Sequence, residues 1–210
     1  VYYICILYFI KMKEKIINYQ FYHWGPFLYR TQVDKKSLEK IQKLCSKNKK
    51  NDYRKNLAGL LKQEYGLDKD KIFTILSGYF NSYIKASVEH YKCSYTGKQI
   101  VMESAWVNYM VKNEINPLHI HSKDLSFVLF IKVPKNLKKE VEETVSSDSK
   151  PGSVNFVNDL KDNKFYISAN NFVPEVGDMF IFPASLHHYV NSFKSNGERI
   201  SISGNLEIIK

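Results

Sequence analysis

The spacing of hydrophobic residues along this chain changes near residue 99, from a helical period to that of strands. Before this point, apolar residues recur every three or four positions, as they do in amphipathic helices. These stripes predict one helix capped by Ser37, a second over Arg54–Tyr65 and a longer third that begins near Asp68. The polar and small residues of Ser94–Gly97 then end the third helix.

From Gln99 onwards, short apolar runs alternate with turn residues, a pattern typical of β-strands. We expect strands at Ile100–Val111, Leu118–His121, Leu125–Val133, Val154–Val157, Phe165–Ser168, Met179–Phe182, His188–Ser192 and Arg199–Ile209. The polar stretch Glu140–Gly152 is expected to form a loop or hairpin. Many short strands with regular turn signals favour a sandwich or jelly roll. The sequence therefore predicts an α+β fold, with an N-terminal helical region (residues 1–98) packed on one face of a β-core (residues 99–210).

Length, composition and cysteine usage indicate a globular protein from a reducing compartment. At 210 residues the chain is long enough for one domain with a substantial core. Its 44% hydrophobic content excludes a disordered chain. The cysteines Cys5, Cys45 and Cys93 are far apart and odd in number, so they form neither a disulfide framework nor a zinc-binding pattern. We therefore expect a cytoplasmic protein.

The formal net charge of +10 raises the question of nucleic-acid binding. The lysines are scattered among acidic residues, and no RNP, KH or zinc-finger pattern accompanies them. We therefore favour a solvated basic surface, while an acidic substrate or partner stays open. The apolar run Val1–Ile10 is too short to span a bilayer and makes a poor signal peptide, so no membrane association is expected. Whether residues 1–11 precede a true start at Met12 is left open.

Candidate metal ligands occur in two separate segments of the second half. Strand alternation places His119 and His121 on one face, with apolar Leu118 and Ile120 on the other. Neutral imidazole is a good ligand for iron, zinc, copper and nickel, although this pair alone is equally consistent with two ordinary polar strand residues. A third imidazole from a distant strand, His188, strengthens the metal interpretation.

Two residues of the last predicted strand favour anion binding. A guanidinium binds a carboxylate through two parallel hydrogen bonds, and Ser201 shares the strand face of Arg199. An isolated R-x-S is common by chance. At this distance beyond His188 it indicates an anion site in the same barrel as the metal.

Together these segments resemble the 2-oxoglutarate/Fe(II)-dependent oxygenases. The resemblance is strongest to a branch frequent in marine phages and microbes, and it is specific over Trp106–Asn205. It rests on His119-Ile120-His121, on Phe182-Pro183-Ala184-Ser185-Leu186-His187-His188 and on Arg199-Ile200-Ser201-Ile202-Ser203-Gly204-Asn205. Trp24–Phe27 and Leu57–Gly59 resemble the same branch more loosely.

The resemblance implies a double-stranded β-helix that holds Fe(II) in its mouth. His119 and His188 match the two histidine ligands, and Arg199 with Ser201 matches the grip on the distal carboxylate of 2-oxoglutarate. The implied activity is hydroxylation of an unidentified substrate by dioxygen, with release of succinate and CO₂.

The chain departs from the superfamily pattern H-x-D/E…H, because His121 stands at the carboxylate position. Three neutral histidines leave a site charge of +2, which 2-oxoglutarate would neutralise. Asp124 is the alternative carboxylate, but strand alternation puts it on the opposite face from His121, which we favour. Asn108 and Asn205 are further candidates for hydrogen bonds to the cosubstrate or to metal-bound water. For Trp106, His23, His90 and His187 we expect structural or surface roles.

Two other functions stay open. A cupin-type dioxygenase also uses three histidines but no 2-oxoglutarate, and Gly177–His188 partly resembles the second cupin motif. However, Leu125 and Ser126 stand where the first cupin motif has its glutamate. The other alternative is a metal-binding β-barrel module without turnover. The direction of the Arg199 side chain discriminates between a 2-oxoglutarate-dependent oxygenase and a cupin-type dioxygenase. A homodimer also stays open.

Overall fold

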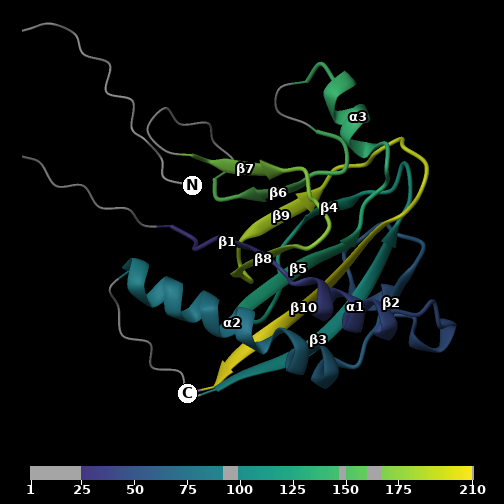
Figure 1. Cartoon of the computed structure of the whole chain (residues 1–210). Helices are drawn as coiled ribbons and strands as arrows, with labels where there is room; N and C mark the ends of the chain where they lie inside the picture. Colours follow the sequence, from purple (N-terminus) through teal and green to yellow (C-terminus); the bar gives the residue numbers. More distant parts are fainter. Residues whose placement is uncertain (1–24, 92–98, 147–149, 160–166, 210) are drawn as a thin grey trace, which may run out of the picture.

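Two antiparallel β-sheets make up most of the structure (Figure 1). The computed structural model describes residues 25–91, 99–146, 150–159 and 167–209. Their strands are β1 (Tyr29–Gln32), β2 (Glu64–Gly66), β3 (Gln99–Met110), β4 (Asn116–His119), β5 (Leu125–Lys132), β6 (Val154–Val157), β7 (Ala169–Phe172), β8 (Asp178–Pro183), β9 (His187–Val190) and β10 (Arg199–Ile209). One sheet has the order β1-β8-β5-β10-β3-β2, and the other has the order β4-β9-β6-β7.

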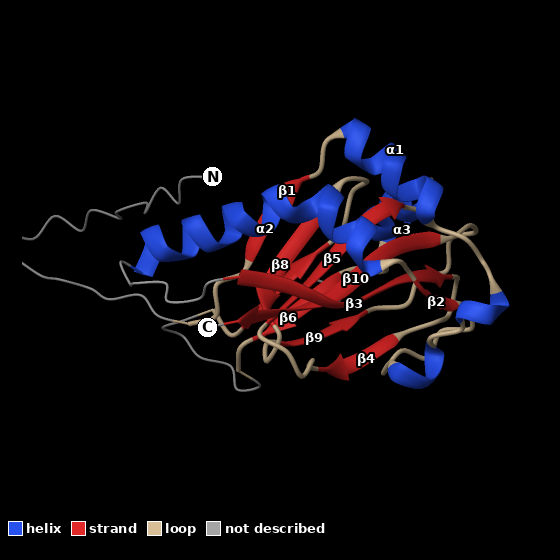
Figure 2. Cartoon of the chain, turned by 90° about the horizontal axis from the view of Figure 1, so that it is seen from below, coloured by secondary structure: helices blue, strands red, loops and turns tan. Residues whose placement is uncertain are grey.

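The described α-helices are α1 (Lys35–Leu44), α2 (Lys69–Tyr91) and α3 (Leu137–Glu143). Figure 2 shows α1 and α2 on one side of the six-stranded sheet and β4, β6 and β9 on the other. None of the helices in the described ranges is long and apolar enough to cross a membrane.

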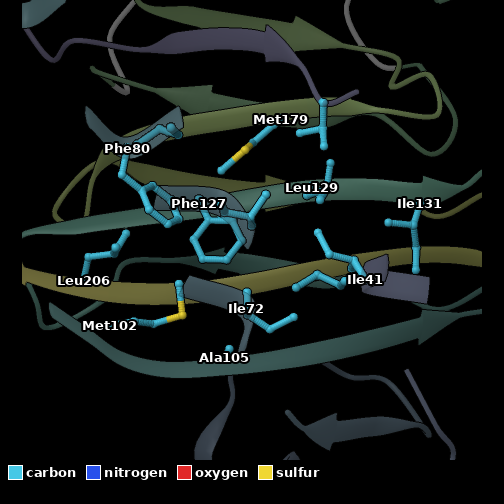
Figure 3. Packing of buried hydrophobic residues seen from close by; sticks show 14 of the residues in the cluster. Ile41, Ile72, Phe80, Met102, Ala105, Phe127, Leu129, Ile131, Met179 and Leu206 are labelled. Carbon is cyan, nitrogen blue, oxygen red and sulfur yellow. The ribbon is translucent and has the colours of Figure 1, made fainter. Parts of the chain in front are cut away.

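Side-chain alternation gives the six-stranded sheet two different faces. On β10, Ile202 and Leu206 join a hydrophobic cluster, whereas Arg199 and Ser201 face the opposite way and line a cavity. The cluster also contains Met102, Phe127, Leu129 and Met179 from the sheet and Ile41, Ile72, Leu76 and Phe80 from α1 and α2 (Figure 3). Burial of the apolar face therefore fixes the direction in which the polar face points.

A second hydrophobic cluster lies on the other side of this sheet and joins it to the four-stranded sheet. The ring of Phe156 on β6 lies 5.5 Å from that of Phe180 and 4.9 Å from that of Phe182, both on β8. Both distances are within the usual range for favourable aromatic pairs. These packed rings hold the two sheets face to face, and Phe182 also lines the cavity.

The strand predictions for the second half are largely confirmed. β6 and β10 have the predicted bounds, and β3, β4, β5, β8 and β9 differ from the prediction by a few residues at their ends. In the strand expected at Phe165–Ser168, the described residues 167 and 168 are not part of a strand, and β7 begins directly after them at Ala169. The stretch Glu140–Gly152 begins inside α3 rather than in a loop.

The first half contains strands that periodicity did not predict. Arg54–Tyr65 is not a helix: a short 3-10 turn covers only Arg54–Asn56, and an extended segment leads from it into β2. Backbone pairing to β3 explains the difference, since Tyr109 N–H donates to the Gln63 carbonyl at 3.0 Å. Gly59 also lowers the helix propensity of this segment. Likewise, β1 pairs with β8 at the other edge of the sheet.

The first helix begins three residues earlier than expected. Asp34, not Ser37, is its N-cap, and the Asp34 carboxylate accepts the Ser37 N–H at 3.0 Å. The third predicted helix is confirmed, because α2 begins at Lys69 after Asp68, whose carboxylate accepts the Lys71 N–H at 3.2 Å. Several predictions lie outside the described residues: those on Val1–Ile10, Met12, Cys5, Cys93, His23, Trp24, Ser94–Gly97 and residues 165–166.

Candidate metal centre

Three histidines from two neighbouring strands converge on one point. β4 and β9 pair antiparallel with His119 directly opposite His188, and their ring centroids lie 4.2 Å apart. His121 follows β4, where its backbone N–H donates to the Ala184 carbonyl at 2.8 Å. Each of the three residues offers one ligand atom, and these atoms lie within 4.8 Å of one another.

Backbone hydrogen bonds orient two of the imidazole rings. Nδ1 of His119 lies 2.7 Å from the Pro117 carbonyl, and Nδ1 of His188 lies 2.9 Å from the Leu186 carbonyl. A carbonyl oxygen only accepts, so each Nδ1 carries the proton and each Nε2 keeps its lone pair. The same arrangement fixes the tautomer of many metal-binding histidines.

Burial keeps all three imidazoles in the neutral form that binds metal. It lowers the pKa of His119, and it lowers the pKa of His121 to about 4 and that of His188 to about 3. Mutual repulsion between the charged forms of neighbouring rings adds to the shifts of His121 and His188. The Phe182 ring, 4.9 Å from that of His188, contributes to the apolar surroundings.

The spacing of the imidazole nitrogens fits a shared ion. Nε2 of His121 lies 3.2 Å from Nε2 of His188. Two nitrogen ligands about 2.0–2.1 Å from one ion would lie about 2.8–3.4 Å apart at the octahedral or tetrahedral angle. Asp124 does not belong to this group, because its carboxylate accepts the Ile208 N–H at 2.7 Å. His187 is exposed on the far side of β9.

A cavity of about 240 Å³ adjoins the histidines and contains Arg199 in its wall. Only 3% of Arg199 is exposed. Its Nη1 donates to the Gly152 carbonyl at 2.8 Å, and its guanidinium carbon lies 5.1 Å from the centre of the Phe130 ring. Nε has no hydrogen-bond partner in the described part of the chain. Burial lowers the pKa of Arg199, but the guanidinium remains charged at neutral pH.

Two of the other predicted cosubstrate-binding residues line the same cavity. Ser201 and Asn108 face each other across β10 and β3, and Asn108 Nδ2 donates to Ser201 Oγ at 3.5 Å. Asn205 does not reach the cavity. Its side chain accepts from Ser126 Oγ at 2.7 Å and donates to Ser104 Oγ at 3.4 Å. Asn205 stands six residues beyond Arg199 on β10, which corresponds to about 20 Å of extended chain.

Glu64, a buried carboxyl group in the cavity wall, is a site residue that the sequence pattern does not predict. It lies opposite Asn108 on β2 and is 1% exposed. Burial raises its pKa to about 7, and repulsion from Glu114 adds to this. Glu64 lies in the segment predicted as a helix, so it was not expected near the site. The sequence signal that points to this segment is Leu57–Gly59, which resembles the oxygenase branch and also lines the cavity.

Comparison with known proteins connects this geometry to one family. Residues 104–205 match the family model described as "Putative 2OG-Fe(II) oxygenase". No curated protein sequence matches the chain. Among solved structures, a 2OG-Fe(II) oxygenase family oxidoreductase from Burkholderia pseudomallei is 13% identical with a TM-score of 0.53, and the match covers 87% of this chain and 84% of that one.

Two further structures share the fold at similar levels. A prolyl-4-hydroxylase from Pseudomonas putida is 10% identical with a TM-score of 0.52, over 87% of this chain and 93% of that one. HygX from Streptomyces hygroscopicus, solved with nickel and 2-oxoglutarate bound, is 8% identical with a TM-score of 0.51, over 88% and 83%. At these identities the likeness concerns the fold alone.

The family match contains the strands that carry the histidine group and Arg199. The three histidines form a group that is suited to a metal ion, as the resemblance of their motifs implies. On this basis, residues 104–205 of this chain belong to the 2OG-Fe(II) oxygenase family.

Proposed function

We propose that the protein is a 2-oxoglutarate- and Fe(II)-dependent oxygenase that hydroxylates a C–H bond of its substrate. The family match over residues 104–205 supports this, as does the paired arrangement of the two antiparallel sheets, which we interpret as a double-stranded β-helix. The packing of α1 and α2 residues with the outer face of the larger sheet supports a single body in which helices back the barrel.

In this proposal His119, His121 and His188 hold the iron through their Nε2 atoms. The donor set fits Fe(II), because imidazole is among its usual ligands and all three rings are neutral. When bound, Fe(II) with 2-oxoglutarate and dioxygen would supply the oxidising power for hydroxylation, with succinate and CO₂ as co-products. The protein itself would bind and orient the reactants and exclude water, and the apolar ring of Phe182 in the cavity wall serves the last purpose.

The observation that carries the proposal is the buried guanidinium of Arg199. It has no ion-pair partner in the described ranges, although an unpaired buried charge is costly. A ligand carboxylate in the cavity would satisfy its free Nε, and the adjacent Ser201 hydroxyl would add a second donor. The cavity of about 240 Å³ suits a small dicarboxylate better than a drug-sized ligand, whose pockets usually exceed about 300 Å³.

Arg199 also separates this function from its rivals. A three-histidine cupin-type dioxygenase has no use for a carboxylate anchor, and neither has a metal-binding module without turnover. Calorimetric titration of the iron-loaded, oxygen-free protein with 2-oxoglutarate tests the proposal, followed by a succinate assay in air. We expect metal-dependent 2-oxoglutarate binding that weakens at least about 30-fold in Arg199→Ala, which corresponds to about 2 kcal/mol for a buried charge pair.

Metal content and a second arginine provide the controls. Arg199→Ala should retain iron, and Arg54→Ala should bind 2-oxoglutarate like the wild type, because Arg54 is an exposed residue paired with Asp52. Iron binding without any 2-oxoglutarate binding would contradict the proposal and favour the cupin-type function. Unchanged affinity in Arg199→Ala would refute the assignment of the anchor.

A further inference from the structure

The cavity wall contains three hydrogen-bond acceptors that the described residues leave without a donor. They are Glu64 Oε2, Asn108 Oδ1 and Asn116 Oδ1, and their side chains come from β2, β3 and β4. Buried acceptors without donors are rare in folded proteins and each costs free energy. Such a set indicates a ligand that brings donors.

The acceptors and Arg199 create two chemically different parts of one cavity. Arg199 contributes a free donor, whereas Glu64 and the two asparagines contribute free acceptors. The charges that act on the Glu64 carboxyl are those of Glu114, Arg54 and Asp52, and Arg199 is not among them. A carboxylate bound at Arg199 would therefore leave Glu64 Oε2 without a hydrogen-bond donor.

Arg54, the cation whose charge acts on the Glu64 carboxyl, is already paired. Arg54 donates to the Asp52 carboxylate at 2.5 Å. The Glu114 carboxylate accepts the N–H groups of Lys62 at 3.1 Å and Val111 at 2.9 Å, so it anchors the segment next to β2. In the described part of the chain no ion pair reaches Glu64.

The position of the Glu64 carboxyl is set before any ligand arrives. Its backbone belongs to β2, in register with Asn108. Gly59 lies against the carboxyl group so closely that a Cβ at residue 59 would stand 2.9 Å from Oε1. The absence of a side chain at Gly59 thus leaves room for Glu64 to face the cavity, and pre-positioned groups bind ligands at lower entropic cost.

We propose that Glu64 is a specificity residue that binds a cationic nitrogen, such as a protonated amine, of the primary substrate. This inference rests on the proposed function, since it assigns Arg199 to the cosubstrate and leaves Glu64 to the substrate. A carboxylate that receives a charge-assisted N–H bond satisfies both partners in a site from which water is largely excluded. The side-chain carbonyl of Asn108, which is in register with Glu64 on the neighbouring strand, is suited to accept a further N–H of the same nitrogen.

Calorimetry with simple amines tests the proposal on the full chain. The protein is loaded with Fe(II) and 2-oxoglutarate without oxygen and is titrated with propyl- to hexylamine and with the alcohol and carboxylate of each chain length. We expect at least one amine to bind, with its alcohol and carboxylate at least about tenfold weaker, which corresponds to about 1.4 kcal/mol. Glu64→Gln should lower the amine affinity at least about tenfold and leave 2-oxoglutarate affinity unchanged.

Gly59→Ala gives a second variant that keeps the carboxyl group but displaces it, and it should weaken amine binding as well. Amine binding that is equal in the wild type and in Glu64→Gln would overturn the inference, and so would alcohols that bind as tightly as amines. If no probe binds to protein that does bind 2-oxoglutarate, the amine site is refuted while the proposed function stands. Glu64-dependent amine binding without 2-oxoglutarate binding would support the amine site and refute the proposed function.

Discussion

Replacing Glu64 by glutamine should change the pH dependence of stability in a calculable way. Burial and the neighbouring Glu114 raise the pKa of Glu64 from 4.5 to about 7, whereas Arg54 opposes the shift and Asp52 adds to it. Between these two pH values the folded state holds a proton that the unfolded state has lost. Wild-type stability therefore falls as pH rises through this window, and an uncharged glutamine removes this loss.

The size of the effect follows from the two pKa values. At about 1.4 kcal/mol per unit of pKa, ionising Glu64 costs the metal-free folded protein at most about 3.5 kcal/mol. Part of this cost is already present at pH 5, so the gain of Glu64→Gln over the wild type should grow by about 2–3 kcal/mol between pH 5 and pH 8. For a chain of this length, the Tm of Glu64→Gln should therefore rise by about 5–10 °C relative to that of the wild type between pH 5 and pH 8.

Urea denaturation of both metal-free proteins at pH 5 and pH 8 measures this difference. The histidine contributions cancel in the comparison, because both proteins contain the same three residues. Glu142→Gln, on the exposed surface of α3, is the control and should show no pH-dependent gain. A stability difference between wild type and Glu64→Gln that is the same at both pH values would refute the reasoning that Glu64 is buried without a partner.

Two further predictions follow from the site and from its surroundings. The metal-free protein should lose stability as pH falls below about 6.5, because the unfolded chain takes up protons on histidines that the fold keeps neutral. His188→Phe should reduce this acid sensitivity in a pH series of thermal melts, and an unchanged series would contradict it. Asn205→Ala should cost about 1–3 kcal/mol in urea denaturation, through the loss of its bonds to Ser126 and Ser104, and should leave 2-oxoglutarate affinity unaffected. Weakened 2-oxoglutarate binding would restore Asn205 to the cosubstrate site.

The local sequence pattern predicts the strand bounds correctly where a strand lies between two others in its sheet. The alternation in Val154–Val157 and Arg199–Ile209 predicted β6 and β10 to the residue, because a strand between two others shows its period directly in sequence. The same alternation placed the imidazoles of His119 and His121 on one face. The structure then brought both of them to His188.

Pattern failed at the edges of the larger sheet. β1 and β2 are short edge strands, and their backbone partners β8 and β3 lie far away in sequence. No local period records such a pairing, so the leucines within Arg54–Tyr65 indicate a helical stripe that the structure does not contain. Leu60 shows the error plainly, because it is 66% exposed.

The sequence by itself therefore determined where most strands of the second half lie along the chain, the long helix and the residue types that can hold a metal and an anion. These properties depend on neighbours a few positions apart, whose spacing is visible in the chain. Only the tertiary structure decided that Asp124 and Asn205 stay away from the site and that Glu64 enters it. The reason is physical: strand register and the pairing of distant edges place these side chains, and both arise from long-range backbone hydrogen bonds and burial.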